Sequence, residues 1–156
     1  MIAKQRIGIV GAGMMGHGIA KNLVEKGFPL AVHGHRSRAP IDDLVGRGAT
    51  EVKTNADLAR ASDIVILCVT GAPQVEEVMI GPEGVAGAAR PGTIVVDTST
   101  SEPATTAKMR DALAKQDVRF VDAPLARTPV EAEQGRLNTM VGADDATFAE
   151  LKPVFA

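Results

Sequence analysis

Three glycines near the amino terminus have the spacing of a turn that binds phosphate groups. Gly11, Gly13 and Gly16 follow the apolar run 7–10 and precede a stretch of helical character. In such a turn the first glycine lets the chain leave the strand sharply, the second lets a pyrophosphate approach the backbone, and the third allows the helix to pack closely on the sheet. Unpaired amides of the first helical turn then face the phosphates. The motif predicts a dinucleotide site formed by Gly11, Ala12, Gly13, Met14, Met15 and Gly16.

Basic and hydroxyl side chains follow the second apolar run. After Leu30–His33 the chain continues through His35, Arg36, Ser37 and Arg38, with no acid among them. Proteins that bind NAD usually place an acid about 20 residues beyond the glycines, on the ribose 2′-hydroxyl, whereas arginine accommodates a 2′-phosphate. We therefore expect NADP rather than NAD as the cofactor, with Arg36 and Ser37 as its phosphate contacts and His35 next. The alternative interpretation is a solvated basic loop.

The elements that must position these residues alternate along the chain. Apolar runs rich in valine, isoleucine and leucine are predicted to be strands that are buried on both faces. They are Arg6–Val10, Leu30–His33, Ile64–Val69, Thr93–Asp97, Arg119–Asp122 and Asn138–Val141. The amphipathic segments between them are predicted to be helices, namely Met14–Lys26, Ile41–Arg47, Asn55–Ala61, Gln74–Met79, Pro103–Lys115 and Asp144–Leu151. This alternation predicts an α/β fold with a doubly wound parallel sheet of the Rossmann type, whose ligand binds at the carboxyl ends of the strands.

Small polar residues mark the expected ends of several helices. Asn55, Asp57 and Ser62 are of the residue types that cap helices, and Gly27 is typical of a helix C-terminal stop. One of the hydroxyl groups of residues 98–100 is expected to cap the helix that follows them.

The composition fits one soluble domain and excludes several classes of function. The chain has 156 residues, a formal net charge of −2 and a pI of about 5.9, so it has no basic excess to attract nucleic acid or an anionic membrane. Aromatic residues make up 3% of the chain, which argues against a base-stacking surface. The single cysteine, Cys68, excludes an internal disulfide and a cysteine-based zinc site. We expect one domain over residues 1–156, located in the cytoplasm, without metal, nucleic-acid or membrane partners.

Several spaced motifs of the chain match one protein family. Residues 11–23 combine the glycine turn with a Met-Gly pair and an Ala-x-Asn-Leu tail, and residues 97–103 read Asp-Thr-Ser-Thr-Ser-Glu-Pro. Residues 122–125 read Asp-Ala-Pro-Leu, and spaced small and apolar residues follow over 132–142. With these motifs the chain resembles the β-hydroxyacid dehydrogenase family, which includes 3-hydroxyisobutyrate, tartronate semialdehyde and 6-phosphogluconate dehydrogenases. The loop at residues 34–37 is similar to the family's Asn-Arg-Thr cofactor loop, in one of two registers.

The resemblance implies further cofactor contacts at the carboxyl ends of the strands. Val69 and Thr70 match the positions where the family's Leu-Pro touches the dinucleotide, and Gln74 matches a polar contact. Thr100 matches the threonine near the nicotinamide. The alternative for Val69 is a core residue.

The resemblance also implies a substrate loop, from which this chain departs. Where the family reads Asp-Ala-Pro-Val-Ser-Gly-Gly, the last three positions are Ala126, Arg127 and Thr128. Ala126 lacks the serine hydroxyl that would hold the substrate carboxylate, so that contact is lost or is made by Thr128. Arg127 replaces a glycine, and its planar guanidinium suits a second anionic group on the substrate. The alternative for Arg127 is a surface pair with Glu131.

The family's general acid/base is a lysine in an all-helical C-terminal domain, which also supplies dimer contacts. By this resemblance the chain corresponds to the cofactor domain alone and stops before the helical domain, so the family's lysine is expected beyond Ala156. Lys152 is not that lysine, and His17, His33 and His35 are in the wrong places for hydride chemistry. We therefore expect no catalytic residue within the 156 residues, an inactive isolated chain, and a homo-oligomeric full-length enzyme.

Two classes of function fit these observations. The first is an NADP-dependent reductase of a small 3-oxo acid or semialdehyde, with an imine reductase as the alternative enzyme, against which residues 122–124 count. The second is a dinucleotide-binding module without catalytic activity. The sequence does not identify the substrate beyond an anionic small molecule.

Overall fold

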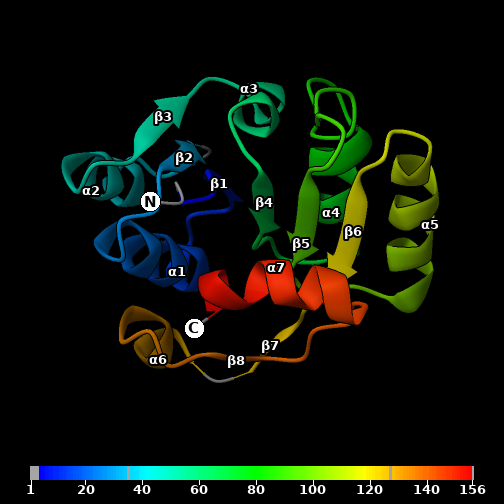
Figure 1. Ribbon diagram of the computed structural model, residues 1–156. Helices are drawn as coiled ribbons and strands as arrows, with labels where there is room; N and C mark the ends of the chain where they lie inside the picture. Colours follow the sequence, from blue (N-terminus) through cyan, green and yellow to red (C-terminus); the bar gives the residue numbers. More distant parts are fainter. Residues whose placement is uncertain (1–3, 35, 127, 156) are drawn as a thin grey trace.

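A six-stranded parallel sheet forms the centre of the molecule, with strands in the order β3-β2-β1-β4-β5-β6 (Figure 1). The strands are β1 (Ile7–Val10), β2 (Leu30–His33), β3 (Thr50–Val52), β4 (Ile64–Leu67), β5 (Ile94–Asp97) and β6 (Arg119–Asp122). The doubly wound Rossmann fold predicted from the sequence is confirmed.

The computed structural model describes residues 4–34, 36–126 and 128–155. Two predicted site residues, His35 and Arg127, therefore lie outside the described residues. Ala156, beyond which the family's catalytic lysine is expected, also lies outside them. The expectations attached to these three positions stay predictions.

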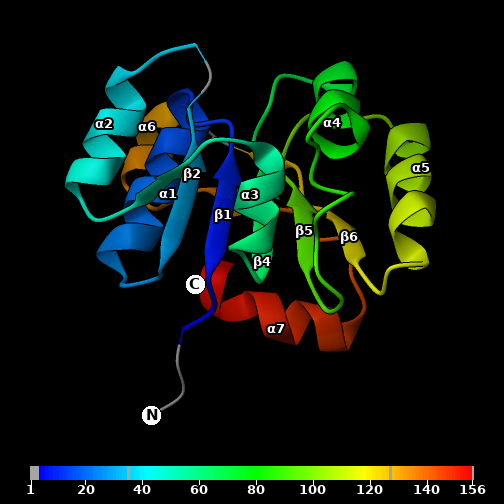
Figure 2. The same cartoon turned by 90° about the horizontal axis from the view of Figure 1, so that it is seen from above.

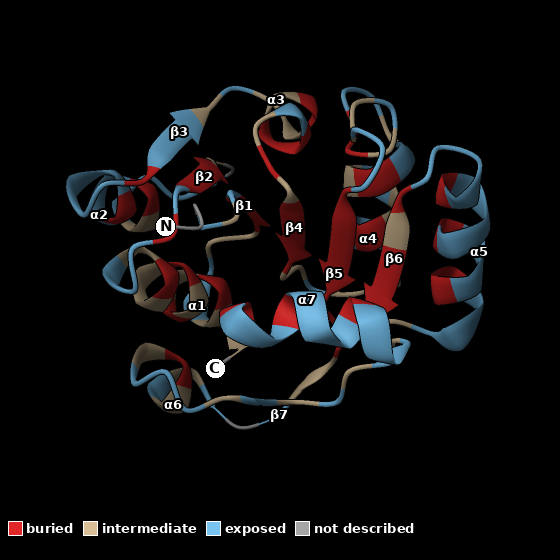
Figure 3. Cartoon of the chain, in the orientation of Figure 1, coloured by how far each residue is buried: buried red, intermediate tan, exposed pale blue. Residues whose placement is uncertain are grey.

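Helices cover both faces of this sheet (Figures 1 and 2). One face carries α1 (Met14–Glu25), α2 (Ala39–Gly46) and α7 (Asp145–Phe155), and the other carries α3 (Asn55–Arg60), α4 (Ala72–Ile80) and α5 (Pro103–Ala114). The central strands are buried, whereas the outer sides of the helices are exposed (Figure 3). Burial on both faces explains why the strands read as continuous apolar runs.

A small antiparallel ribbon lies outside the main sheet. It consists of β7 (Leu125–Ala126) and β8 (Asn138–Thr139), and the short helix α6 (Pro129–Glu133) connects them. The predicted strand Asn138–Val141 is therefore wrong as a member of the parallel sheet. The segment before Asn138 forms β7 and the five-residue helix α6, not a full crossover helix, and the chain turns back to pair with β7 in the opposite direction.

The ends of the strands explain how the fold can build a site. The carboxyl ends of neighbouring parallel strands meet at one edge of the sheet, and the predicted site residues follow these ends.

No helix among the described residues is both long enough and apolar enough to cross a membrane.

Candidate cofactor and substrate site

The turn between β1 and α1 requires glycine at two of its three motif positions. Gly11 has a φ of +96°, which favours glycine, and a Cβ there would overlap the carbonyl oxygen of Cys68. A Cβ on Gly16 would overlap the carbonyl oxygen of Gly11. At Gly13, by contrast, a Cβ would meet no atom of the described chain within 4 Å. The space at Gly13 therefore fits a ligand that approaches the backbone.

The amino end of α1 offers its amides at this turn. Gly13 is the N-cap residue, and within the described residues it has no side-chain cap and the first turn has no acid. Met14 is exposed and Met15 is half-buried at the same end of the helix. Uncapped amides at the positive end of a 12-residue helix form an anion site, and a dinucleotide pyrophosphate fits it.

Hydroxyl groups join the ends of β4 and β5. The Thr98 hydroxyl donates to the carbonyl of Leu67 at 2.6 Å, and the Ser99 hydroxyl accepts from the amide of Val69 at 3.0 Å. The prediction that a hydroxyl of residues 98–100 caps α5 is therefore wrong, because α5 begins after Glu102 without a side-chain cap among the described residues. These hydroxyls instead fix the geometry of the two strand ends.

Two loops at this edge approach each other. Thr70 and Gln74 are exposed on the segment after β4, Val69 is half-buried, and Thr100 is exposed after β5. A Cβ built on Gly71 would lie 3.8 Å from the carbonyl oxygen of Thr100 and 3.6 Å from the side-chain oxygen of Gln74. The residues that the resemblance implies as cofactor contacts are thus brought together at the carboxyl ends of β4 and β5.

A pair of carboxylates stands at the ends of β5 and β6. Asp97 and Asp122 are register partners, and Asp97 is fully buried. One Asp97 oxygen accepts from the amide of Ser99 at 2.9 Å and the other from the hydroxyl of Ser101 at 2.7 Å. Burial, together with the negative charge of Asp97, raises the pKa of the Asp122 carboxyl above its usual value.

The two arginines in the loop after β2 differ in their contacts. Arg38 forms ion pairs with Glu51 and Asp42, and the contact with Arg38 lowers the pKa of the Glu51 carboxyl. Arg36 and Ser37 are exposed, and Arg36 makes no ion pair with any described residue. Glu51 comes from β3, a strand that sequence reasoning missed. Among the described residues of this loop, the arginine that no carboxylate engages is therefore Arg36.

The described residues of the predicted substrate loop lie at the end of β7 and at the start of α6. Ala126 is exposed at the end of β7, and Thr128 is the N-cap of α6. Glu131 accepts a hydrogen bond from the backbone amide of Thr128, and the Thr128 side chain accepts one from the backbone amide of Glu131, which together make a capping box. The Thr128 hydroxyl also donates to the Glu131 carboxylate. The proton of the Thr128 hydroxyl is thus directed to Glu131, while the oxygen can still accept a bond from a ligand.

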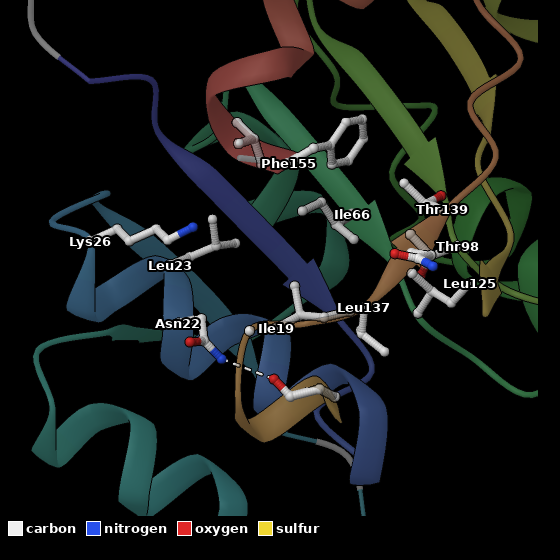
Figure 4. A pocket seen from close by; sticks show the side chains of 14 residues that line it. Ile19, Asn22, Leu23, Lys26, Ile66, Thr98, Leu125, Leu137, Thr139 and Phe155 are labelled. Carbon is white, nitrogen blue, oxygen red and sulfur yellow. Dashed lines mark hydrogen bonds between the residues drawn. The ribbon is translucent and has the colours of Figure 1, made fainter. Parts of the chain in front are cut away.

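Helix α6 packs tightly against the glycine-loop helix α1. A Cβ on Gly18 would lie 2.6 Å from the carbonyl carbon of Ala132, so glycine is needed for this approach. The Asn22 side-chain amide donates to the carbonyls of Gly18, Ala132 and Glu133 at 2.8, 2.9 and 3.3 Å. Figure 4 shows the bond from Asn22 to α6. The cofactor helix and the loop helix are therefore held as one unit.

We expect Asn22→Leu to lower the free energy of unfolding by about 1–3 kcal/mol, because carbonyls of α1 and α6 lose their donor. The measurement is urea-induced unfolding. Gln116→Leu, at an exposed amide, is the matched control and should change stability little. Equal stability of the two variants would show that Asn22 does not hold α6.

An apolar hollow of about 100 Å³ lies between α1, the ribbon and the end of α7 (Figure 4). Ile19, Leu23, Leu137 and Phe155 are among the residues that line it, with Thr98 as one of its polar groups. None of the predicted cofactor residues lines it among the described residues, so the glycine turn and not this hollow defines the candidate site.

Comparison with known proteins agrees with this geometry. A model of the NAD-binding domain of 6-phosphogluconate dehydrogenase matches residues 6–156. The chain belongs to this family of NAD-binding domains. The resemblance derived from the motifs is confirmed.

Two curated relatives are oxidoreductases. The chain is 37% identical to 2-(hydroxymethyl)glutarate dehydrogenase of Eubacterium barkeri over 151 residues, which cover 97% of this chain and 50% of that protein. It is 35% identical to 2-hydroxy-3-oxopropionate reductase of Escherichia coli K12, over 96% of this chain and 51% of that protein. The chain thus spans about half the length of the curated relatives it matches.

Solved structures share the fold closely. A 3-hydroxyisobutyrate dehydrogenase from Salmonella typhimurium has a TM-score of 0.89 and 29% identity, covering 97% of this chain and 53% of its own. Psf3, solved with NADP⁺ and 2-OPP, has a TM-score of 0.88 and 29% identity, covering 96% of this chain and 52% of its own.

Proposed function

We propose that this chain is the NADP(H)-binding part of an oxidoreductase that reduces a small 3-oxo acid or semialdehyde and, in reverse, oxidises a 3-hydroxy acid. The observation that carries the proposal is the turn after β1, where Gly11 and Gly16 are required by the chain itself and Gly13 is open. The oxidoreductase relatives and the NADP⁺ complex of the similar Psf3 support it.

In the proposed complex the chain binds and orients the dinucleotide in an extended path. The amides of the first turn of α1 donate to the pyrophosphate, and Arg36 with Ser37 binds the 2′-phosphate. Val69, Thr70 and Gln74 line the middle of the path. The bound dinucleotide carries the hydride, and Thr100 stands beside its nicotinamide end.

The proposed substrate is an anionic small molecule held by residues 126–128. Ala126 offers no hydroxyl. The Thr128 hydroxyl reaches the substrate carboxylate by turning its proton away from Glu131, and Arg127 binds a second anionic group. The name of the Eubacterium barkeri relative supports a doubly charged substrate, because 2-(hydroxymethyl)glutarate is a dicarboxylate. We propose that the whole protein acts as a homo-oligomer, as the resemblance implies.

We expect the 156-residue chain to bind NADPH saturably and yet to reduce no semialdehyde at an enzymatic rate. The amides of α1 and the side chains after β2, β4 and β5 supply the binding contacts, whereas the acid/base lysine that the resemblance implies belongs to another domain. The lack of general acid/base catalysis alone costs about 10²–10⁴-fold in rate. Fluorescence titration with NADPH and a steady-state assay with tartronate semialdehyde test the two parts.

The two measurements have separate consequences. Failure of NADPH to bind would overturn the cofactor assignment. Robust turnover would instead show that an acid/base lies within these residues, with Asp122 the first to be replaced because its raised pKa suits proton transfer.

A further inference from the structure

His17 lies between two carboxylates on different helices. Its Nε2 is 2.7 Å from an oxygen of Asp43 on α2, and its Nδ1 is 2.7 Å from an oxygen of Glu133 on α6. The histidine itself belongs to the first turns of α1. We call these three residues the His17 bridge; it connects three helices that are far apart in the sequence.

The chemistry of the two partners sets the protonation state of the imidazole. An ionised carboxylate can only accept, so both ring nitrogens must donate, and the ring must then be a cation. Each carboxylate also accepts from a permanent cation. Arg47 donates to the same Asp43 oxygen at 2.9 Å, and Lys21 donates to the other oxygen of Glu133 at 3.2 Å. These cations keep the carboxylates ionised.

The charges around the bridge balance only when His17 is charged. Arg47 also forms an ion pair with Glu25 of α1, at 3.1 Å. The titratable groups that face His17 are therefore Lys21 and Glu25 on α1, Asp43 and Arg47 on α2, and Glu133 on α6. With an imidazolium, three positive groups meet three negative ones.

Each helix of the bridge adjoins a different part of the proposed cofactor and substrate site. The amino end of α1 forms the pyrophosphate turn. Helix α2 follows the loop with Arg36 and Ser37, and α6 follows the loop of residues 126–128. A contact from α1 to both helices therefore fixes the two loops relative to the turn between them.

We propose that His17 is a positioning residue that, as an imidazolium, holds the 2′-phosphate loop and the substrate loop in register with the glycine turn, so that cofactor binding weakens when His17 loses its proton. This inference rests on the proposed function. A neutral ring would turn a lone pair toward one carboxylate at 2.7 Å, and one of the two helices would lose its contact.

The direction of the pH effect follows from the contacts. Burial favours the neutral ring, but the hydrogen bonds and charges of Glu133 and Asp43 together outweigh it and raise the pKa of His17 above its usual value. A raised pKa in the folded state means that the stabilisation is complete below the ordinary histidine pKa and is lost as the pH rises through the folded value. Cofactor affinity should decline over the same alkaline interval.

The test is the dissociation constant of NADPH, measured by fluorescence titration from about pH 7 to about pH 9. Over this interval the 2′-phosphate is already dianionic, because its second pKa is about 6. The constant should rise about three- to tenfold in the wild-type chain. In His17→Gln it should equal the alkaline wild-type value at every pH. Asp43→Asn keeps the imidazole but detaches α2, and it should lose the same pH dependence.

Lys108→Gln, on the opposite side of the sheet, is the matched control and should retain the wild-type profile. Nuclear magnetic resonance of ¹⁵N-labelled histidine in the free protein gives an independent readout, in which both ring nitrogens of His17 should be protonated at about pH 7. A neutral ring there, or the same pH profile in wild type and His17→Gln, would overturn the proposal. A chain that binds no NADPH at any pH would overturn the proposed function itself and, with it, this role of His17.

Discussion

Replacement of Gly13 by alanine is expected to weaken NADPH binding about ten- to hundredfold while the fold stays intact. A methyl group at this position meets no atom of the described chain within 4 Å, so folding has no reason to change. It occupies the space through which the pyrophosphate reaches the amides of α1. Each lost hydrogen bond to a charged group is worth about 1.5–3 kcal/mol, which corresponds to this range of affinity.

Gly16→Ala is the matched comparison, because there the added methyl group overlaps the carbonyl oxygen of Gly11. We expect it to lose about 1–3 kcal/mol of folding stability from overpacking in addition to the cofactor affinity. Urea unfolding and NADPH titration of both variants separate the two effects. If Gly13→Ala binds NADPH as tightly as the wild type, the pyrophosphate does not lie at this turn.

Arg36→Glu is expected to reverse the preference for NADPH over NADH. The wild-type guanidinium donates charge-assisted hydrogen bonds to the 2′-phosphate, and these contribute about 1.5–3 kcal/mol, or about ten- to hundredfold in affinity. A carboxylate at the same position repels the phosphate and can accept from a ribose hydroxyl. Isothermal titration with both dinucleotides gives the ratio of their affinities.

The control for this experiment is Arg38→Gln, only two residues away. Arg38 is engaged by Glu51 and Asp42, so its replacement should leave the ratio of NADPH to NADH affinity unchanged. An equal loss of NADPH preference in both variants would assign the phosphate to the loop as a whole. Tighter binding of NADH by the wild type would reject the NADP assignment.

The architecture could be predicted because its strands are apolar on both faces. Burial between two helical layers leaves a continuous run of valine, isoleucine and leucine, as in β4 and β5. The exceptions are the short strands. β3 has the sequence Thr-Glu-Val at the edge of the sheet, where two of its three residues are exposed. β7 and β8 have two residues each, too few to show any periodicity.

The prediction of a helix cap failed where two neighbouring residues could each supply the cap. At the start of α3 the cap is Thr54, whose hydroxyl accepts from the amide of Asp57 at 3.0 Å, and Asn55 is already in the helix. Gly27, with φ of +85°, follows α1 as predicted.

The motif that marks the glycine turn could be recognised from the sequence, because each of its positions is set by local backbone geometry. The partners of His17 could not, because they come from α2 and α6, far along the chain.

The contact of Asn22 with α6 has a consequence for the order of folding. The hydrogen bond from Asn22 to the carbonyl of Ala132 joins residues 110 positions apart, and the strands β2 to β6 lie between them in the sequence. Closing so long a loop is entropically costly until the strands have already brought its ends together. Helix α6 should therefore dock late, and in the native protein it should open at a lower free energy than the central strands. The segment that follows the substrate loop would then be able to detach and return without disturbing the sheet that holds the cofactor.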